Sequence, residues 1–464
     1  MSSLYELACS NPHLKYIDDD SQVYLPLSEI HLYDFNSSDF GAHKPVLIFA
    51  YLDNSLKSIQ RFWSAINSIG CVALLPANLN PAFKRSLEET YSPHIILDIE
   101  RVSIEDYVQI IESGIFLRQK VGAVTLHHNI KVLLNTSGTT GSPKFVKLSE
   151  DNLLSNALSI SAYLPIQSSD VTPLNLPIHY SYGLSILTSN SINGGTIVCS
   201  NTDVLNRNFW SKMDFFGYTS LAGVPFVYEM LDRIGFTKKS YKSLRYLTQA
   251  GGKLKTELAI KFAEYAQLSD IDFFIMYGAT EATARMSYLP PKLLLLKPDS
   301  IGKPIPNGFF HIDPSTSELL YKGANVFGGY VDKPEDLSNY DAPDWLKTGD
   351  IASKDEDGCY YIKGRLKRFV KLFGNRINLD EVESILNSSL SVQAKCIGVE
   401  DKWLAIFYIG TAKIESEVTN YLHKVMQLHP SKLKFISIHE FPYTINGKVN
   451  YQELQNKLPE FTTS

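Results

Sequence analysis

Short apolar runs alternate with longer amphipathic stretches through the first half of the chain. Residues 46–52, 71–75 and 94–98 are apolar runs rich in β-forming side chains. Between the first two, residues 54–70 place apolar side chains at helical spacing, and Gly70 is a plausible stop for that helix. This alternation predicts βαβ units and a parallel sheet, the hallmark of an α/β fold.

The same alternation recurs further along the chain, where apolar strands run directly into polar loops. Residues 131–135 precede a loop rich in Gly, Ser and Thr, and a helix is predicted from about residue 152 to 163. Residues 243–254 and 271–282 each read as a strand followed by a polar turn. Because ligands bind outside the carboxyl ends of strands in open α/β sheets, we expect these loops to carry a binding site.

The pattern changes at about residue 301, where short strands are joined by Gly, Pro and Asn turns. After Asn378, the sequence predicts a helix, two strands, another helix and a strand, which together form a small α+β unit of roughly 90 residues. The boundary between the two parts is expected near residues 364–367.

Composition narrows the class of protein. The chain has 464 residues, of which 44% are hydrophobic and 20% charged, with a formal net charge of −5. These values fit a soluble globular protein of more than one domain and give no support to nucleic acid as the main partner. No apolar run reaches the roughly 18–20 residues of a membrane span. The N-terminal residues do not resemble a signal peptide, so we expect a cytoplasmic protein.

The stretch LLNTSGTTGSPKFVKLS, residues 133–149, contains the most suggestive loop. Successive backbone N–H groups in such a turn can form an anion-binding nest, and Lys144 would add a positive charge. The spacing of Gly138 and Gly141 does not fit the Walker A pattern. From these residues alone, a phosphate-binding loop and an ordinary polar loop both stay open.

Further segments with a distinctive sequence follow this loop along the chain. Together with the loop they are TSGTTGSPK (136–144), LPIHYSYGL (176–184), TQAGGKL (248–254), MYGATEA (276–282), GANVFGGYVDKPE (323–335), WLKTGD (345–350), GRLKRFVKLFGNRINLDEVE (364–383) and NGK (446–448). In these segments and their order, the chain resembles the adenylate-forming superfamily along nearly its whole length. This superfamily includes acyl-CoA and aryl-CoA synthetases, luciferases and stand-alone adenylation enzymes.

The resemblance implies a large N-terminal domain, residues 1–364, of parallel and mixed sheets flanked by helices, with a distorted β-barrel-like subdomain. It also implies a small mobile α+β domain, residues 365–464, with a hinge near Lys367. The implied reaction uses ATP and Mg²⁺ to convert a small carboxylic acid to an acyl-adenylate with release of pyrophosphate. The acyl group then passes to a thiol, either of CoA or of the phosphopantetheine arm of a carrier protein. Since the chain ends soon after Lys448, we expect the acceptor to be a separate molecule.

The resemblance also assigns roles to single residues. Thr280 would contact the α-phosphate, Glu281 would bind Mg²⁺, and Lys448 would bridge the acid and the α-phosphate. For thioester formation, rotation at Lys367 would replace Lys448 by the segment around Lys371 and Gly374. Nucleotide contacts are implied for Thr136, Ser137, Gly138, Thr139, Thr140, Gly141, Lys144, Gly251, Gly252, Tyr277, Gly278, Asp350 and Arg365. Taken singly, each has an ordinary alternative, such as a solvated glutamate, a turn-capping aspartate or a turn lysine.

The acid pocket is expected to include Tyr180, Tyr182, Gly223 and Met276. Relatives often have histidine at the position of Tyr180, whereas this chain has histidine one residue earlier, at His179. In a strand, His179 would point to the opposite face from Tyr180. Because HYSYGLS contains no aspartate, an ordinary α-amino acid is disfavoured as the substrate. Phe145 stands where many relatives have glycine, and the sequence gives no physical reason for this change.

Two other functions stay open at the level of sequence. An adenylated amino or hydroxy acid could pass to an amine or a hydroxyl, for example in the modification of a surface polysaccharide. A degenerate nucleotide-binding regulator is the non-enzymatic alternative. The sequence names neither the acid nor the acceptor.

Overall fold

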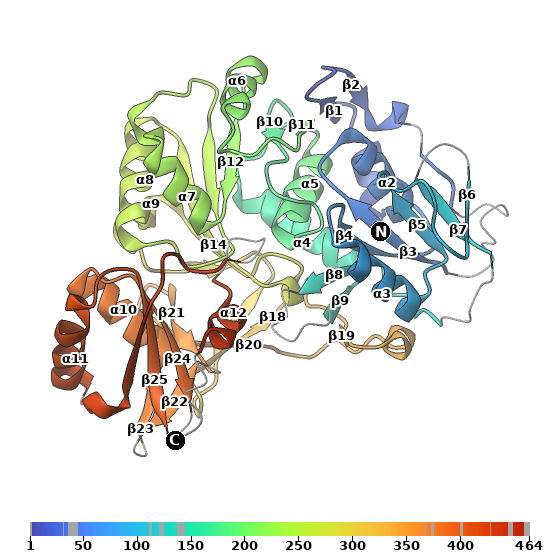
Figure 1. Ribbon diagram of the computed structural model, residues 1–464. Helices are drawn as coiled ribbons and strands as arrows, with labels where there is room; N and C mark the ends of the chain where they lie inside the picture. The colour runs from blue at the N-terminus through green and yellow to red at the C-terminus, as the bar shows by residue number, and fades with distance from the viewer. Residues whose placement is uncertain are drawn as a thin grey trace. The chain divides into compact units, whose positions relative to one another are not determined.

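The computed structural model describes residues 2–30, 32–35, 45–110, 114–119, 125–136, 144–366, 368–372, 375–399, 402–426, 428–443 and 449–458 (Figure 1). The chain divides into two compact units: a large unit of residues 1–309 and 322–346, and a small unit of residues 310–321 and 347–464. The domain boundary at residues 364–365 and the hinge stay predictions, and Lys367 lies outside the described residues.

The first sheet of the large unit has the order β19-β9-β8-β4-β3-β5-β7-β6 in the described residues. Its strands are β3 (Leu47–Leu52), β4 (Cys71–Pro76), β5 (Ile95–Asp98), β6 (Tyr107–Gln109), β7 (Ile115–Arg118), β8 (Val132–Thr136), β9 (Lys144–Leu148) and β19 (Tyr330–Val331). The pairs β3–β4, β3–β5 and β4–β8 are parallel, whereas β9 runs antiparallel to β8. Helices α2 (Leu56–Ile66) and α3 (Pro81–Tyr91) connect the parallel strands, which confirms the predicted βαβ units.

One detail of that prediction is wrong. Helix α2 ends at Ile66, with Asn67 as its C-cap, so Gly70 does not stop it. A Cβ atom on Gly70 would lie 2.4 Å from the carbonyl oxygen of Val46. Gly70 is therefore required by the close approach of two chain segments rather than by the end of a helix.

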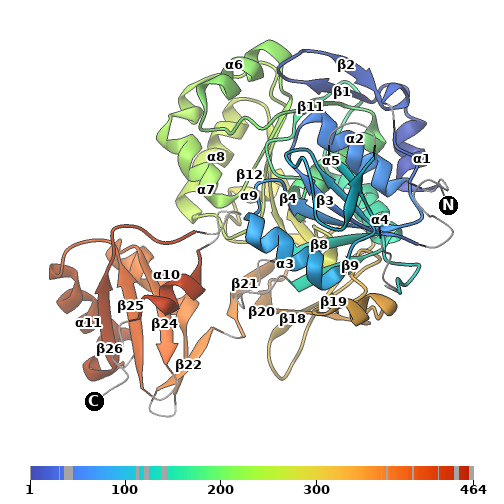
Figure 2. The same cartoon turned by 45° about the vertical axis from the view of Figure 1, so that its right-hand side comes forward.

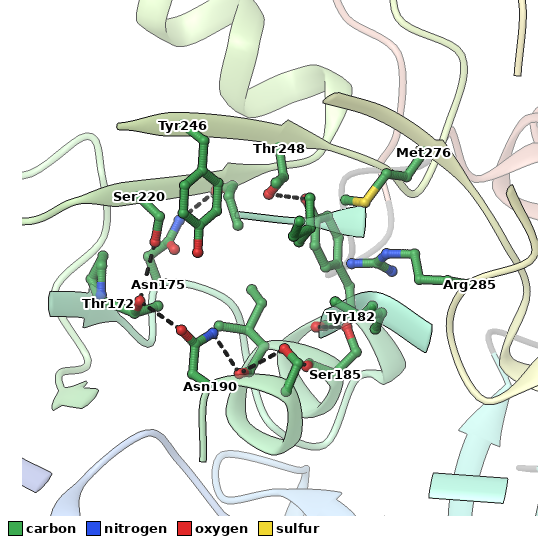
Figure 3. A pocket seen from close by; sticks show the side chains of 16 residues that line it. Thr172, Asn175, Tyr182, Ser185, Asn190, Ser220, Tyr246, Thr248, Met276 and Arg285 are labelled. Atoms are coloured by element: carbon green, nitrogen blue, oxygen red, sulfur yellow. Dashed lines mark hydrogen bonds between the residues drawn. The ribbon is translucent and has the colours of Figure 1, made fainter. Parts of the chain in front are cut away.

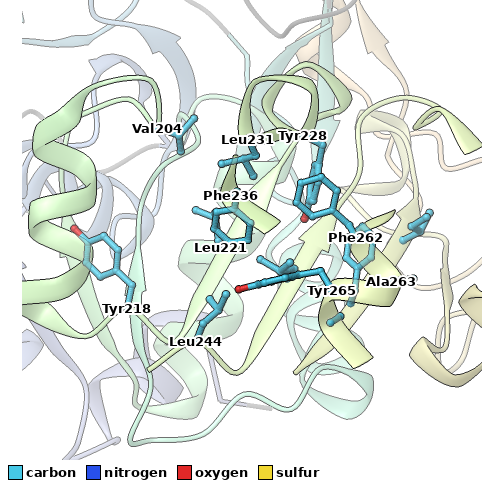
Figure 4. Packing of buried hydrophobic residues seen from close by; sticks show 14 of the residues in the cluster. Val204, Tyr218, Leu221, Tyr228, Leu231, Phe236, Leu244, Phe262, Ala263 and Tyr265 are labelled. Atoms are coloured by element: carbon cyan, nitrogen blue, oxygen red, sulfur yellow. The ribbon is translucent and has the colours of Figure 1, made fainter. Parts of the chain in front are cut away.

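The second sheet has the order β12-β13-β14-β15-β16. Its strands are β12 (Ser220–Gly223), β13 (Tyr246–Gln249), β14 (Asp272–Tyr277), β15 (Ser287–Leu289) and β16 (Lys303–Pro304), and the first three are parallel. Helices α6 (Arg207–Phe216), α7 (Pro225–Arg233) and α8 (Thr256–Leu268) lie along this sheet. Figure 4 shows the aromatic core between them, in which the Tyr228 and Phe262 ring centroids are 4.9 Å apart.

Helices α4 (Glu150–Tyr163) and α5 (Ser181–Asn193) pack against each other between the two large sheets (Figures 1 and 2). Helix α4 begins with a capping box in which the Ser149 side chain accepts from the backbone N–H of Asn152. Shorter elements complete the large unit: α1 (Leu4–Cys9), β1 (Lys15–Asp18), β2 (Tyr24–Pro26), η1 (Leu27–Glu29), β10 (Val171–Pro173), β11 (Thr196–Cys199), η3 (Phe236–Lys238), η4 (Thr280–Ala282), α9 (Pro291–Leu294) and η5 (Pro334–Ser338).

The small unit holds most of the sheet β17 (Phe309–Ile312), β18 (Glu318–Lys322), β20 (Leu346–Lys354) and β21 (Tyr360–Arg365). Its later elements are β22 (Phe369–Leu372), β23 (Asn375–Asn378), α10 (Leu379–Leu390), β24 (Ala394–Val399), β25 (Trp403–Tyr408), α11 (Lys413–Met426), η6 (Pro430–Lys432), β26 (Leu433–Ser437) and α12 (Tyr451–Asn456). The α/β class and the α+β pattern after Asn378 are thus confirmed. Within the described ranges, no helix combines the length and the apolar character that crossing a bilayer requires.

Candidate functional site

Lys144 and Glu281 both contact Tyr330. The Lys144 Nζ is 4.2 Å from the centroid of the Tyr330 ring and 3.2 Å from Oδ2 of Asp332. The Tyr330 hydroxyl donates a hydrogen bond of 2.9 Å to Oε1 of Glu281. This arrangement follows from the fold because β19, which carries Tyr330, pairs with β9, which begins at Lys144. A cation and a carboxylate therefore sit together at the end of the Gly/Ser/Thr-rich loop.

The protonation state of Tyr330 is set by its surroundings. Burial, and then the negative charge of Glu281, raise the pKa of its hydroxyl above the ordinary value of 10. The hydroxyl is therefore a proton donor to Glu281 throughout the physiological pH range. A carboxylate oriented in this way is a suitable oxygen ligand for a hard cation such as Mg²⁺.

The segment that carries Thr280 and Glu281 is a single 3₁₀ turn directly after β14. The backbone N–H of Phe327 donates to the Glu281 carbonyl at 2.9 Å, and the Thr283 hydroxyl donates to the Asn325 carbonyl at 2.8 Å. Thr283 has a φ of 63°, in the left-handed region. These contacts fix the turn and hence the position of the two predicted site residues.

Gly278 is required by close approach of the chain, and Gly251 is favoured by its positive φ. A Cβ on Gly278 would lie 1.7 Å from the carbonyl oxygen of Ala284, so no other residue fits there without backbone movement. Gly251 has a φ of 87°, and a Cβ there would lie 3.1 Å from the Tyr180 hydroxyl oxygen. Gly252 follows it, with Pro225 as its nearest neighbour. These glycines allow neighbouring segments to pack closely beside Tyr180 and at the end of β14.

Asp350 and Arg365 meet within the small unit. They are register partners in the antiparallel pair β20–β21, and the Arg365 Nε donates to Oδ1 of Asp350 at 3.1 Å. Asp350 is only 5% exposed, whereas the Arg365 side chain is 66% exposed. The carboxylate is thus fixed, and the guanidinium reaches from it toward solvent.

Three further predicted site residues lie in strands, and others lie outside the described part of the chain. Thr136 ends β8 opposite Lys144, and Lys371 belongs to β22 opposite Arg376. Tyr277 ends β14. The predicted residues that lie outside the described part of the chain are Ser137, Gly138, Thr139, Thr140, Gly141, Lys367, Gly374 and Lys448.

A small pocket lies between α4, α5 and the second sheet (Figure 3). Its volume is about 20 Å³, which is room for about one water molecule, so side chains must move before an organic acid can enter. Tyr182 and Met276, both predicted pocket residues, line it. The other polar or charged residues of the lining are Thr172, Asn175, Ser185, Ser189, Asn190, Ser220, Tyr246, Thr248 and Arg285.

Hydrogen bonds set the walls of this pocket. The Tyr182 hydroxyl donates to Oγ1 of Thr248 at 2.9 Å, and Asn175 Nδ2 donates to the Ala222 carbonyl at 2.6 Å. Burial raises the pKa of Tyr182 to about 12, although the neighbouring Arg285 acts in the opposite direction. The guanidinium of Arg285 lies 3.9 Å from the centroid of the Tyr182 ring. Figure 3 shows both side chains at one end of the pocket.

Sequence reasoning missed Arg285, Asn175 and Thr248. The available signal was Arg285 itself, because a cation in the apolar segment between YGATEA and the strand Ser287–Leu289 is unusual. Tyr180 packs beside Tyr182 without lining the pocket, and Gly223 ends β12.

The expectation that strand alternation separates His179 from Tyr180 is wrong, because these residues form a turn. The backbone N–H of Tyr180 donates to the Pro177 carbonyl at 3.0 Å, and Tyr180 is the N-cap of α5. Burial of the His179 imidazole lowers its pKa to about 4, and its Nδ1 is buried without a hydrogen-bond partner. His179 does not line the pocket.

Phe145 now has a physical explanation. Its side chain is fully buried in the first sheet, where its ring centroid lies 5.6 Å from that of Tyr91 and 6.4 Å from that of Phe49. A glycine here would remove an aromatic side chain from a packed core. The residue therefore stabilises the strand that positions Lys144.

Comparisons with known proteins show what the chain is similar to. The family model described as AMP-binding enzyme matches residues 40–331. Among curated proteins, the chain is 28% identical to a probable CoA ligase, CCL9, of Humulus lupulus over 69% of this chain and 65% of that protein. It is 26% identical to a 2-succinylbenzoate–CoA ligase of Staphylococcus epidermidis over 71% of this chain and 70% of the relative. The match thus spans just under two thirds of the first of these relatives.

Solved structures show the same fold. O-succinylbenzoate CoA synthetase (MenE) from Bacillus subtilis in complex with ATP and a magnesium ion has a TM-score of 0.77 and 21% identity, over 97% of this chain and 98% of the other. The same enzyme in complex with its acyl-adenylate intermediate has a TM-score of 0.76 and 22% identity, over 97% of each chain.

Proposed function

Because the chain belongs to the AMP-binding enzyme family, we propose that it uses ATP and Mg²⁺ to activate a small carboxylic acid as an acyl-adenylate, with release of pyrophosphate. The acyl group then passes to the thiol of CoA. The observation that carries this proposal is the group of Lys144, Tyr330 and Glu281 at the end of the Gly/Ser/Thr-rich loop.

The residues present fit Mg-ATP. Mg²⁺ usually keeps several waters and takes one or two carboxylates together with phosphate oxygens, so the single carboxylate of Glu281 is enough. Lys144 supplies a compact positive charge for phosphate oxygens. Asp350 is acceptor-only when ionised, which suits a pair of ribose hydroxyls, and Arg365 beside it suits the ribose or a phosphate.

The chemistry requires charge neutralisation and positioning more than covalent assistance. A carboxylate oxygen attacks the α-phosphorus of ATP, and the bond to the pyrophosphate group breaks. In this proposal Thr280 contacts the α-phosphate and Lys448 stabilises the charge that develops between the acid and the phosphate. Lys144, the loop residues 136–141 and the backbone around Gly251, Gly252 and Gly278 position the nucleotide.

Transfer of the acyl group is the second half of the proposal. Thiol attack on the adenylate carbonyl releases AMP, and a rotation near Lys367 would exchange Lys448 for the segment around Lys371 and Gly374. CoA is the proposed acceptor because the relatives described above carry the name CoA ligase. The alternative acceptor is the phosphopantetheine arm of a carrier protein. We also propose a cytoplasmic location, where ATP and CoA are available.

Pyrophosphate exchange into ATP tests the first half-reaction. The full chain is assayed with Mg²⁺ and a panel of short aliphatic, hydroxy, aromatic and amino acids. Lys448→Ala should lose exchange with the preferred acid by about a hundredfold or more, because one stabilising charge is removed. Lys457→Ala is the matched control, since the side chain of this lysine is 47% exposed and pairs with Glu453 one helical turn away.

The outcomes separate the possible functions. Exchange with an acid, followed by thioester formation with CoA, supports the full proposal. A second outcome is pyrophosphate exchange without acyl transfer to CoA or to a carrier protein. If the acyl group then passes to an amine or a hydroxyl, that acceptor replaces the thiol in the second half-reaction of the proposal. ATP binding without exchange for any acid would indicate a nucleotide-binding regulator and contradict the proposal. Normal exchange by Lys448→Ala would show that this lysine does not act in adenylation.

A further inference from the structure

Arg285 places a buried positive charge in the wall of the small pocket. The residue is 4% exposed, and its guanidinium stacks on the Tyr182 ring at 3.9 Å (Figure 3). Removing a charged group from water is costly unless an opposite charge and hydrogen bonds compensate for it. A buried arginine at this position therefore requires an explanation.

The protein itself does not supply a counter-ion to Arg285. Its Nε is buried without a hydrogen-bond partner, and none of the carboxylates in the described ranges forms an ion pair with it. Other partly buried arginines differ, since Arg245 pairs with Asp170 and Arg368 with Glu383. Arg61, which is 5% exposed, is the other arginine of similar burial in the described ranges, and it does not line the pocket.

The aromatic neighbours of Arg285 are neutral. The Tyr163 hydroxyl contacts the guanidinium, and burial raises the pKa of both Tyr163 and Tyr182 despite the opposing effect of Arg285. Neither phenol is ionised at physiological pH, so neither neutralises the positive charge. Stacking on Tyr182 contributes attraction of the cation–π type but does not use the in-plane donors of the guanidinium, of which Nε has no hydrogen-bond partner.

The backbone at Arg285 is fixed. Its carbonyl accepts hydrogen bonds from Nδ2 of Asn156 at 3.2 Å and from Nδ2 of Asn325 at 2.8 Å. Its Cα lies 3.0 Å from the position that a Cβ on Gly278 would occupy, so the segment packs directly on the end of β14. These contacts hold the backbone of Arg285 in place, and the stacking on Tyr182 positions its guanidinium in the wall of the pocket.

From this unpaired, fixed charge we propose that the acid is a dicarboxylic acid, with one carboxylate reacting and the other pairing with Arg285. This inference rests on the proposed function, because it takes the pocket as the place that receives the acid. The planar guanidinium matches a carboxylate and can donate two parallel hydrogen bonds to it. The second carboxylate supplies the charge and the acceptors that the pocket lacks.

The test compares dicarboxylic acids with monocarboxylic acids of matched length in the pyrophosphate-exchange assay on the full chain. The pairs are malonate and propionate, succinate and butyrate, glutarate and valerate, and phthalate and benzoate. We expect at least one dicarboxylic acid to exceed its partner at least tenfold in kcat/KM. If every monocarboxylic acid equals or exceeds its partner while exchange occurs, this inference is wrong and the proposed function stands.

Substitution of Arg285 then separates recognition from packing. Arg285→Met keeps the length and apolar volume of the side chain but removes the charge. It should lower kcat/KM for the preferred dicarboxylic acid at least tenfold and leave its monocarboxylic partner unchanged or improved. Arg285→Lys keeps a positive charge but loses the two parallel donors of the guanidinium. Its kcat/KM for the preferred dicarboxylic acid should lie between those of wild type and Arg285→Met. Arg233→Met, at an exposed position of α7, is the control.

A structural role predicts a different result. If Arg285 only packs on Tyr182, Arg285→Met lowers exchange with both members of a pair by the same factor, and the inference is overturned. Should Arg285→Met fail to fold, Arg285→Lys and the wild-type comparison still decide the question. Absence of exchange with every acid, by a chain that binds ATP, contradicts the proposed function itself.

Discussion

The hydroxyl of Tyr330 donates a hydrogen bond of 2.9 Å to Oε1 of Glu281. Removing this donor in Tyr330→Phe should weaken Mg²⁺ binding, because the carboxylate would lose the group that orients it. Hydrogen bonds to charged groups contribute about 1.5–3 kcal/mol, and the side chain is 39% exposed, so we expect the lower end of that range. The Mg²⁺ concentration that gives half-maximal pyrophosphate exchange should rise about tenfold.

The phenylalanine ring keeps the surface against which Lys144 lies, so the change isolates the hydroxyl. Tyr24→Phe, at a residue that is 53% exposed in β2, is the control and should not alter the Mg²⁺ dependence. An unchanged Mg²⁺ titration for Tyr330→Phe would show that this hydrogen bond does not support metal binding.

The fixed carboxylate of Asp350 yields a prediction about the nucleotide. Asp350→Asn replaces an acceptor-only group by an amide and should raise the KM for ATP by about tenfold to a hundredfold, since a ribose hydroxyl would lose a charged acceptor. Wild type should also discriminate strongly against 3′-deoxy-ATP, and the variant should not. Steady-state exchange with both nucleotides measures this.

Asp344→Asn is the matched control for that experiment, because Asp344 pairs with Lys322 at the surface and its side chain is 91% exposed. Such surface pairs contribute little, about 0–1 kcal/mol. If wild type and Asp350→Asn discriminate equally between ATP and 3′-deoxy-ATP, Asp350 does not bind the ribose.

Gly278→Ala should destabilise the fold. The added Cβ would meet the Ala284 carbonyl oxygen at 1.7 Å, so the backbone near Arg285 must shift, and we expect a loss of about 3 kcal/mol in the free energy of unfolding. Gly217→Ala is the contrasting variant. Gly217 has a φ of 70° and its nearest neighbour would be 3.7 Å from the Cβ, so only left-handed strain of about 1–2 kcal/mol applies. Urea unfolding measures the free energy of unfolding of both variants. Similar unfolding midpoints for Gly278→Ala and Gly217→Ala would refute the packing argument.

The buried parallel strands could be predicted from the sequence because they are nearly continuous apolar runs. Strand β3 is buried along its whole length, and β4 along all but its last residue, as expected for a sheet covered on both faces. Helix α5 could not be predicted. Its sequence SYGLSILTSNSIN has no apolar stripe, because the helix is buried on most sides. Its hydroxyls instead bond within the helix, as when Ser189 Oγ donates to the Ser185 carbonyl.

The residues of the candidate site likewise divide into those that the sequence predicts and those that only the structure reveals. The sequence predicts Lys144 and Glu281 as site residues because each belongs to a recognisable segment. The link between them, Tyr330, and the charge of Arg285 were not found, because both depend on contacts between residues distant in the chain. The local sequence shows an unusual cation at Arg285, but it does not show whether that arginine is buried or has an ion-pair partner. Its significance comes from the absence of an ion-pair partner among the described residues, which only the three-dimensional structure reveals.

The imidazole of His179 should make stability depend on pH. Burial lowers its pKa from 6.5 to about 4, so between these values the unfolded chain binds more protons than the folded chain. Stability should therefore fall as the pH falls from 6.5 toward 4. The full shift corresponds to about 3 kcal/mol in the free energy of unfolding. His179→Asn removes this group and should flatten the dependence in that window, as urea unfolding at several pH values would show. His13→Asn, at an exposed residue, should leave the slope unchanged. A slope that persists in His179→Asn would assign the titration to another group.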